Sequence, residues 1–233
     1  MNKKDVELFF EFKENIITIS AFDKNFKNLF HNKIFIDNKS KEFLIKLDKD
    51  IKENILKVEK ITNQQINDVN TILNLNKTQK ITLNVPSKVN KKISNYDDLI
   101  YLIQDARQNI LRNNKHLYIL HIIMDNFYYD YKKHENYDFN KKHQNFSIDL
   151  KFYCYPLREI IEFRELFGKI NLSIHKFICS DYVKSFKTLT MSSLDFHLQA
   201  YKILLGQNSK EVQIVLKKQK NKGIFEKIFQ FFS

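Results

Sequence analysis

The strings IKENILKVEK (residues 51–60) and LYILHIIMDNFYYD (residues 117–130) bound the stretch of sequence that decides the fold. In the first string, apolar side chains recur every three or four residues, which is typical of a helix that lies on a sheet. The second string begins with a nearly continuous apolar run up to Met124, as a strand buried on both faces requires. The stretch therefore predicts helices packed on a sheet.

Two strands and a second helix are predicted between these strings. The strands are Ile66–Leu75 and Ile81–Val85, separated by a polar bend. The helix follows Ser94, whose hydroxyl can accept hydrogen bonds from the free backbone N–H groups of the first turn. Asp97 and Asp98 complement the positive end of the helix dipole. The predicted order is helix, strand, strand, helix, strand.

One sheet is expected to unite this stretch with a later strand. Because the strands are apolar and the helices are amphipathic, both helices should cover the same sheet. The helices are Ile51–Lys60 and Asp97–Asn109, and the strands are Asn67–Leu75, Leu117–Met124 and Ile148–Tyr155.

The N-terminal residues predict antiparallel strands. Val6–Phe12 and Ile16–Phe22 are apolar and are separated by three polar residues. This pattern predicts a hairpin in which Asn15 takes a left-handed turn conformation. Two further short strands are predicted at Lys33–Asp37 and Glu42–Leu47.

The last part of the chain predicts alternating helices and strands. A helix is expected at Leu157–Phe167, ending at Gly168. A strand at Asn171–Ile178 and a short helix at Asp181–Leu189 should follow. The polar residues Lys132–Gln144 predict a surface loop.

The composition predicts a folded, basic protein. Of the 233 residues, 43% are hydrophobic and 14% are aromatic, which is too apolar for a disordered chain. The formal net charge of +12 favours an anionic partner, either acidic lipid or nucleic acid. Cys154 and Cys179 are the only cysteines and lack C-x-x-C spacing. We expect them to be reduced thiols in the cytoplasm, with neither a disulfide nor a zinc site.

The N-terminus and the hydropathy predict a protein that stays in the cytoplasm. The start MNKKDVELFF carries Glu7 within its apolar part and lacks a small-residue cleavage site, so a signal peptide is not expected. No run approaches the roughly 20 apolar residues that a membrane-spanning helix needs.

Several strings resemble the FtsA family of bacterial cell-division proteins, which are actin-like membrane tethers. VEKITNQQI, NDVNTILNL, KVNKKIS, NYDDLIYLIQDARQNI and LYILHIIMDNFYYD are similar in order and spacing to the subdomain inserted in the first lobe of FtsA. The later strings YCYPLREIIEFRELFGKINLSIHKFICSDYVKSFKTL and SSLDFHLQAYKILLGQ resemble the end of that subdomain and the last helix of the lobe. The second lobe of the family has no counterpart here.

The resemblance implies an α+β fold. It would consist of an actin-like first-lobe remnant, an inserted helix-covered β-sheet subdomain and a C-terminal amphipathic helix. The implied parts are first-lobe strands at 1–48, the inserted subdomain at 49–178, return helices at 179–206, a basic linker at 207–222 and a membrane-targeting helix at 223–233.

The first hairpin turn departs from the FtsA pattern. In FtsA this turn is rich in Asp and Gly, and its backbone N–H groups hold nucleotide phosphates. The corresponding residues here, Glu11–Asn15, contain no glycine. A Cβ prevents the close backbone approach, and the carboxylate of Glu14 repels phosphate, which Lys13 offsets only in part. We therefore expect no nucleotide, no other cofactor and no enzymatic activity.

The C-terminal residues 223–233 predict a membrane anchor. Apolar side chains fall on one helical face behind a lysine-rich linker, the architecture of an interfacial anchor, and FtsA ends in such a helix. The expected membrane-binding residues are Lys217, Lys218, Lys220, Lys222, Ile224, Phe225, Lys227, Ile228, Phe229 and Phe232. The alternative is a terminal helix docked on the protein's own core. A single such tail should bind weakly, so firm attachment needs several tails held together.

A second function remains open, that of a basic nucleic-acid-binding protein. Arg112 and His116 resemble the Arg-x4-His pair of HEPN ribonucleases, although the spacing is one residue short. The alternative is a basic helix end that complements its own dipole. The histidines lack acidic or cysteine neighbours at ligand spacing, so no metal site is expected.

The resemblance implies a non-enzymatic tether or scaffold of the division machinery, peripheral on the inner face of the cell membrane. The expected partners are anionic inner-membrane lipid, further copies of the protein and other division proteins, and not nucleic acid. In FtsA, contact with FtsZ runs through the second lobe, so direct FtsZ binding is not expected.

Overall fold

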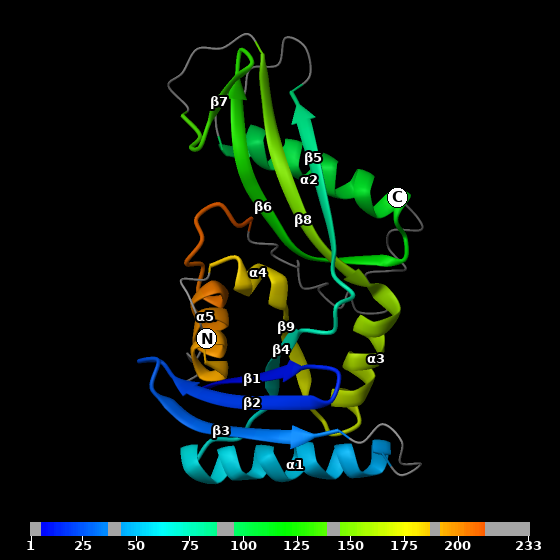
Figure 1. Cartoon of the computed structure of the whole chain (residues 1–233), viewed down its shortest axis with the longest axis vertical. Helices are drawn as coiled ribbons and strands as arrows, with labels where there is room; N and C mark the ends of the chain where they lie inside the picture. Colours follow the sequence, from blue (N-terminus) through cyan, green and yellow to red (C-terminus); the bar gives the residue numbers. More distant parts are fainter. Residues whose placement is uncertain (1–5, 37–42, 88–95, 139–144, 187–191, 213–233) are drawn as a thin grey trace, which may run out of the picture.

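The computed structural model describes residues 6–36, 43–87, 96–138, 145–186 and 192–212. These residues form two sheets, one above the other along the long axis of the molecule, together with five helices (Figure 1). The predicted α+β class is confirmed.

The larger sheet has five strands in the order β3-β2-β1-β4-β9. Its first three strands are antiparallel, and β4 and β9 run parallel to β1. The strands are β1 (Val6–Phe12), β2 (Ile16–Asp23), β3 (Asn28–Phe35), β4 (Asp68–Leu73) and β9 (Ser173–Cys179). The predicted hairpin is confirmed, but Asn15 is not among the residues with positive φ, so its left-handed turn is wrong.

Helices cover both faces of the larger sheet. Figure 1 shows this sheet on edge, with α1 (Phe43–Thr62) beneath it and α5 (Ser193–Leu204) above. Alternate residues of β1 face opposite ways, so that Phe9 packs in the core beside α5 and Phe10 in the core beside α1. The sequence pattern placed a strand at 42–47, whereas the structure has helix from residue 43. This difference arises because Leu47 continues the helical stripe of Ile51 and the residues after it.

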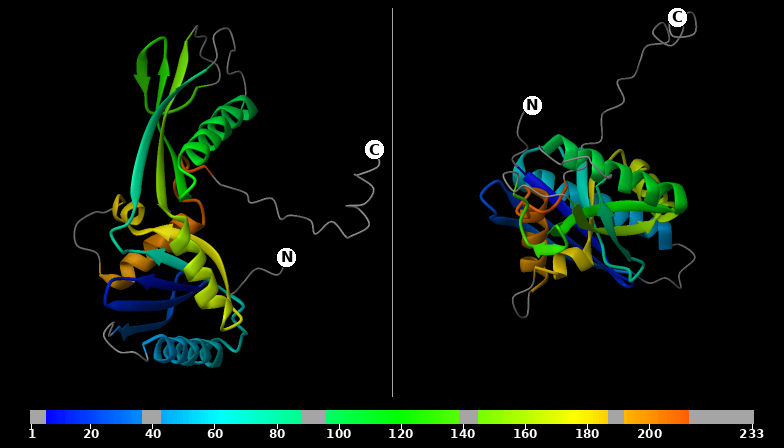
Figure 2. Two further views of the ribbon diagram at one scale, coloured as in Figure 1. Left: turned by 90° about the vertical axis from the view of Figure 1, so that its right-hand side faces the viewer. Right: turned by 90° about the horizontal axis from the view of Figure 1, so that it is seen from above.

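The smaller sheet is antiparallel, in the order β5-β8-β6-β7. Its strands are β5 (Gln79–Pro86), β6 (Leu117–Tyr129), β7 (Lys132–His134) and β8 (Phe146–Pro156). Helix α2 (Tyr96–Asn113) covers one face, as Figure 2 shows, and buries Leu99, Ile103, Ala106 and Ile110 against the strands. The predicted surface loop at 132–144 begins with β7, so the prediction of a loop is wrong for residues 132–134.

The prediction that one sheet holds residues 67–75, 117–124 and 148–155 is wrong. β4 lies in the larger sheet, between β1 and β9, and α1 packs on that sheet as well. The smaller sheet is formed by β5, β6, β7 and β8 alone. The physical reason is that an apolar strand suits either sheet, and its parallel partner β1 is remote in sequence.

The chain returns to the larger sheet through α3 (Leu157–Gly168), β9 and α4 (Ser180–Lys184). Residues 207–212, predicted as linker, then lie against β6. The predicted membrane-binding residues, from Lys217 to Phe232, lie outside the described residues. None of the described helices is both long and apolar enough to span a bilayer.

Candidate functional site

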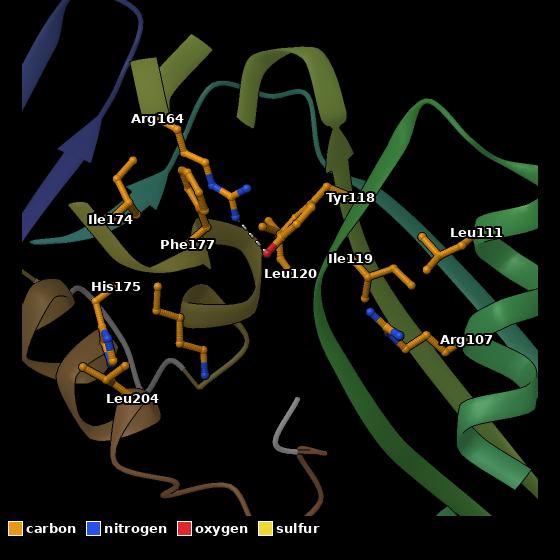
Figure 3. Close-up of a pocket in the computed structure, with 11 residues that line it drawn as sticks. Arg107, Leu111, Tyr118, Ile119, Leu120, Arg164, Ile174, His175, Phe177 and Leu204 are labelled. Carbon is orange, nitrogen blue, oxygen red and sulfur yellow. Dashed lines mark hydrogen bonds between the residues drawn. The ribbon is translucent and has the colours of Figure 1, made fainter. Parts of the chain in front are cut away.

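A pocket of about 420 Å³ lies where the smaller sheet meets the larger one (Figure 3). Residues of α2 and β6 line one side, and residues of α3, β9 and the end of α5 line the other. The volume is within the range of roughly 300–1,000 Å³ that is typical of ligand pockets. We call it the junction groove, and its polar and aromatic lining residues are Arg107, Tyr118, Arg164, His175, Lys176 and Phe177.

Local structure explains how these side chains reach the groove. Arg107 directly follows Ala106 in the buried stripe of α2, so its stem starts at the edge of the helix–sheet interface. On β6, Tyr118 is half-buried at the start of the strand. On the opposite side, Arg164 of α3 extends over the ring of Phe177 on β9 (Figure 3).

The groove is cationic. Among the described residues that line it are three cations, Arg107, Arg164 and Lys176, and no carboxylate. The guanidinium carbon of Arg164 lies 5.5 Å from the ring centre of Tyr118 and 5.7 Å from that of Phe177, which is cation–π distance.

Two of these cations are only partly satisfied by the protein. The Nε of Arg107 is buried and has no hydrogen-bond partner in the described structure. The Nζ of Lys176 lies 3.6 Å from the buried carboxylate of Glu211. A buried donor without a partner is costly, so a ligand that accepts from Arg107 would be favoured. The groove is thus suited to a ligand that carries both a carboxylate and apolar groups.

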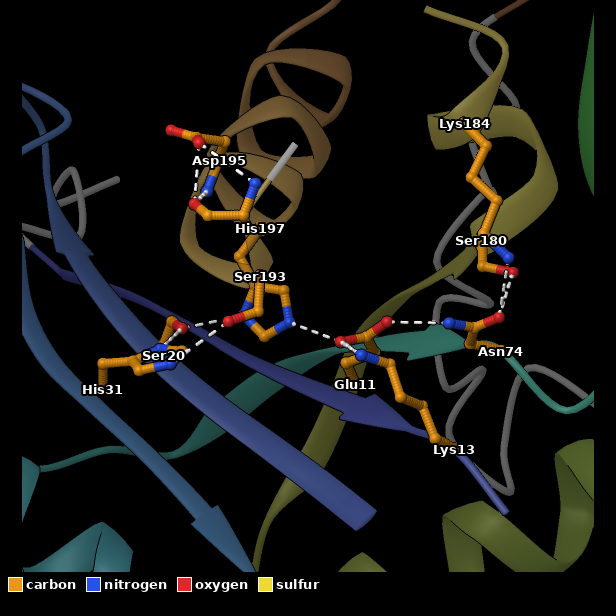
Figure 4. Close-up of polar contacts among 11 residues, drawn as sticks. Glu11, Lys13, Ser20, His31, Asn74, Ser180, Lys184, Ser193, Asp195 and His197 are labelled. Carbon is orange, nitrogen blue, oxygen red and sulfur yellow. Dashed lines mark hydrogen bonds and ion pairs between the residues drawn. The ribbon is translucent and has the colours of Figure 1, made fainter. Parts of the chain in front are cut away.

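A second polar cluster lies at the end of β1 and β4 (Figure 4). One carboxylate oxygen of Glu11 is 3.0 Å from Nζ of Lys13 and 3.2 Å from Nε2 of His197, and the other accepts from Asn74 at 2.8 Å. The Nδ1 of His197 is 2.8 Å from Oγ of Ser20. We call these five residues the Glu11 network.

The network holds a charge inside the protein. The Glu11 side chain is only 1% exposed. Burial alone raises its pKa, but the hydrogen bond and charge of His197, together with the hydrogen bonds of Lys13 and Asn74, more than offset this. The pKa of Glu11 is therefore below its usual value, and the carboxylate is ionised at neutral pH.

The hairpin of β1 and β2 contains the turn for which the sequence predicts no phosphate binding. Here the backbone N–H of Lys13 donates to the carbonyl of Ile16 at 3.0 Å, so this donor is used within the hairpin. The hollow beside Glu11 measures about 170 Å³, which is below the usual size of a ligand pocket. The arrangement favours a closed structural cluster over a nucleotide site.

The order Ser20, His197, Glu11 resembles a hydrolase triad, but the geometry excludes this chemistry. Both Ser20 and His197 are completely buried. A nucleophilic hydroxyl must meet its substrate, and Ser20 instead lies between His197 and the Nδ1 of His31, 2.8 Å away. The network joins β1, β2, α5 and the end of β4, and Ser20 links it to His31 on β3, so that it stabilises the fold.

Arg112 and His116 are both exposed, and neither lines the junction groove. Arg112 donates to Gln108 of its own helix at 3.5 Å. The groove residues and His197 were not identified from the sequence as site residues, because they come from elements that only the tertiary fold brings together.

No protein-family model and no curated protein matches the sequence. Solved structures do match. The PilM-PilN type IV pilus biogenesis complex matches with a TM-score of 0.50 and 10% identity, over 76% of this chain and 48% of that chain. The cytoplasmic domain of EpsL, an inner membrane component of the type II secretion system of Vibrio cholerae, matches at 0.37 and 9%, over 76% and 57%.

A Bacteroides thetaiotaomicron protein with an actin-like ATPase fold and unknown function matches at 0.33 and 11%, over 78% of this chain and 56% of that chain. The chain thus spans about half the length of these three structures. The likeness to the first structure, together with the topology of the larger sheet, supports one conclusion. The chain has an actin-like α+β fold.

Proposed function

We propose that this protein is a non-enzymatic, FtsA-like scaffold that binds a partner protein in the junction groove and does not bind nucleotide. The observation that carries the proposal is the buried, ionised Glu11 at the end of β1. It lies at the turn where the resembled family holds nucleotide phosphates.

Lys13 is already paired with the buried carboxylate of Glu11, so a bound triphosphate would have to draw this lysine away from it. A metal ion that joined Glu11 to a phosphate would have to displace Lys13 and His197, which hold the carboxylate. Both routes oppose binding, which supports a role without nucleotide hydrolysis.

The junction groove supports the choice of a protein partner. Its three cations and its rings of Tyr118 and Phe177 suit a peptide segment with an acidic side chain next to an apolar one. The matched PilM is part of a complex with PilN, which also favours a protein partner over a metabolite.

The proposal also includes a cellular location and a mode of membrane attachment. We assign the protein to the division machinery at the inner face of the cell membrane, because of its resemblance to FtsA. Anionic lipid would be bound by the tail residues between Lys217 and Phe232, and further copies of the chain would supply the several tails that firm attachment needs.

Site-specific photo-crosslinking in native cells tests the groove. A photoreactive phenylalanine at Leu111, which lines the groove, should give one discrete cross-linked protein. The matched control is Leu56, an exposed leucine on α1, which should give none. Adding Arg107→Ala and Arg164→Ala should remove the cross-link at Leu111. Equal cross-linking at both positions, or a product that survives loss of both arginines, would contradict the proposal.

A further inference from the structure

Residues 207–212 follow α5 and lie across the junction of the two sheets; we call them the C-terminal strap (Figure 1). Glu211 forms an antiparallel bridge with Ile123 of β6. The backbone N–H of Val212 donates to the carbonyl of Ile122, and that of Met124 donates to the carbonyl of Lys210, both at 2.9 Å. The strap thus adds a short strand to the edge of β6.

A buried polar cluster fastens the strap. One carboxylate oxygen of Glu211 is 2.8 Å from Nδ1 of His121, and the other accepts from the hydroxyl of Tyr182 at 3.0 Å. The side chains of His121 and Glu211 are 0% and 2% exposed. The backbone N–H of Cys179 donates to Nε2 of His121 at 3.0 Å. His121 therefore carries its proton on Nδ1 and donates it to the carboxylate.

Every element around His121 contributes to this arrangement. The strap supplies Glu211, β9 supplies Lys176 and the Cys179 N–H, and α4 supplies Tyr182. The ring of Tyr153 on β8 packs against the imidazole with ring centres 6.2 Å apart. Within the described residues, the basic side chains that contact the carboxylate of Glu211 are those of His121 and Lys176.

Acid disturbs the cluster at both partners. Burial lowers the pKa of His121, although Glu211 partly counters this. For Glu211, burial raises the pKa, but His121, Lys176 and Tyr182 outweigh it, so its pKa is lowered. Protonation of His121 would place an N–H at Nε2, directly facing the N–H of Cys179. Protonation of Glu211 would remove its attraction to Lys176.

We propose that the His121–Glu211 pair is an acid-sensitive latch that holds the C-terminal strap on β6 at neutral pH and releases it as the pH falls. Release frees residues 207–212 from their contacts with β6. It also removes the carboxylate partner of Lys176, which leaves an additional uncompensated cation in the junction groove. The latch itself does not depend on what the groove binds.

Amide hydrogen exchange of the full chain, followed by NMR, tests the latch. Protection factors of Val212 and Met124 are compared at about pH 7.5 and about pH 5.5, on either side of the ordinary histidine pKa of about 6.5. When the strap is released, the protonated form of His121 on β6 should outnumber the neutral form by about tenfold at the lower pH. Both amides should lose about five- to tenfold in protection, whereas the amide of Phe10 in β1 should not.

Two variants separate the latch from a general effect of acid. His121→Gln keeps an acceptor for Cys179 but cannot take up a proton, and Glu211→Gln keeps the shape without the charge. In both, the change with pH should shrink to less than about twofold. His116→Gln, an exposed histidine just before β6, should behave like the natural chain.

Three results would overturn the proposal. One is equal protection of Val212 at both pH values in the natural chain, a measurement that stands even if a variant fails to fold. Another is an unchanged pH response in a folded His121→Gln protein. The third is an equal loss of protection at Phe10, because that would mean global unfolding.

Discussion

The Glu11 network and the junction groove are both polar, but they differ in how far the protein satisfies its own charges (Figures 3 and 4). In the network, the carboxylate of Glu11 has three partners within 3.2 Å. In the groove, three cations gather without a carboxylate among the described lining residues, and the Nε of Arg107 has no partner.

This difference indicates that the Glu11 network stabilises the fold, whereas the junction groove is suited to bind a ligand. A cluster whose charges neutralise one another strengthens the fold and gives a ligand little to bind. A pocket with uncompensated donors gains when a ligand of opposite charge enters. In this chain, the cluster at the end of β1 belongs to the first class, and the junction between the sheets belongs to the second.

Breaking the Glu11 network should have the largest effect on stability. His197→Leu leaves the carboxylate of Glu11 buried without its histidine, and loss of one partner of a buried pair costs about 3–5 kcal/mol. Urea unfolding should report this loss. The control Ser193→Ala, which removes only a 3.4 Å contact to His31, should cost less than about 1 kcal/mol. If the His197→Leu protein were as stable as the Ser193→Ala control, the result would contradict a structural role of the network.

Acid should have the next largest effect. Because folding lowers the pKa of His121, its contribution to stability is complete above about pH 6.5 and is lost as the pH falls below that value. The lowered pKa values of Glu11 and Glu211 add a second loss below about pH 4.5.

Each proton contributes at most about 1.4 kcal/mol per pH unit to the free energy of unfolding. Denaturation across this range should show a flatter dependence for Glu211→Gln than for the natural chain. The control Glu53→Gln, at a half-exposed position on α1, should leave the dependence unchanged. A free energy of unfolding that rises on acidification from neutral pH would contradict the predicted direction of the pH dependence.

The sequence predicted those helices and strands that have a clear local pattern of apolar residues. The hairpin of β1 and β2, the helix α2 and the buried strand β6 were all predicted near their observed positions. β4 was found as a strand but assigned to the wrong sheet. Its partners β1 and β9 are both remote in sequence, and no local pattern specifies a parallel pairing of that kind.

The sites were harder to predict than the strands. The absence of glycine from residues 11–15 pointed to the end of β1, but His197, which completes the network, lies 186 residues from Glu11. The cations of the groove come from three different elements, α2, α3 and β9. The predicted membrane-binding residues fall outside the described residues, so that hypothesis stays a prediction.

The groove arginines should matter for partner binding and hardly for stability. Arg164 is solvent-accessible and holds its rings by cation–π contacts, each of about 0.5–1 kcal/mol at an exposed site. The two contacts together contribute about 1–2 kcal/mol, so Arg164→Ala should lower the free energy of unfolding, measured in urea, by no more than about 2 kcal/mol. If Arg164→Ala lowered stability as much as His197→Leu does, the groove residues would serve to stabilise the fold and not to bind a partner.

The tail should contribute least to stability. Phe225→Glu or Phe229→Glu should abolish co-sedimentation of the purified chain with vesicles of phosphatidylglycerol and phosphatidylcholine, and leave the melting temperature unchanged. Pure phosphatidylcholine vesicles are the control. A docked terminal helix would instead show a melting temperature lowered by several degrees, since 1 kcal/mol is about 2–4 °C at this size.

We propose that the end of β1 is a closed structural cluster and holds no nucleotide. Calorimetric titration of the full chain with Mg-ATP tests it most directly. We expect no binding heat across the micromolar range, because Glu11 is buried, ionised and already paired with Lys13 and His197. A dissociation constant below about 100 μM, equivalent to roughly 5.5 kcal/mol of binding free energy, would contradict it.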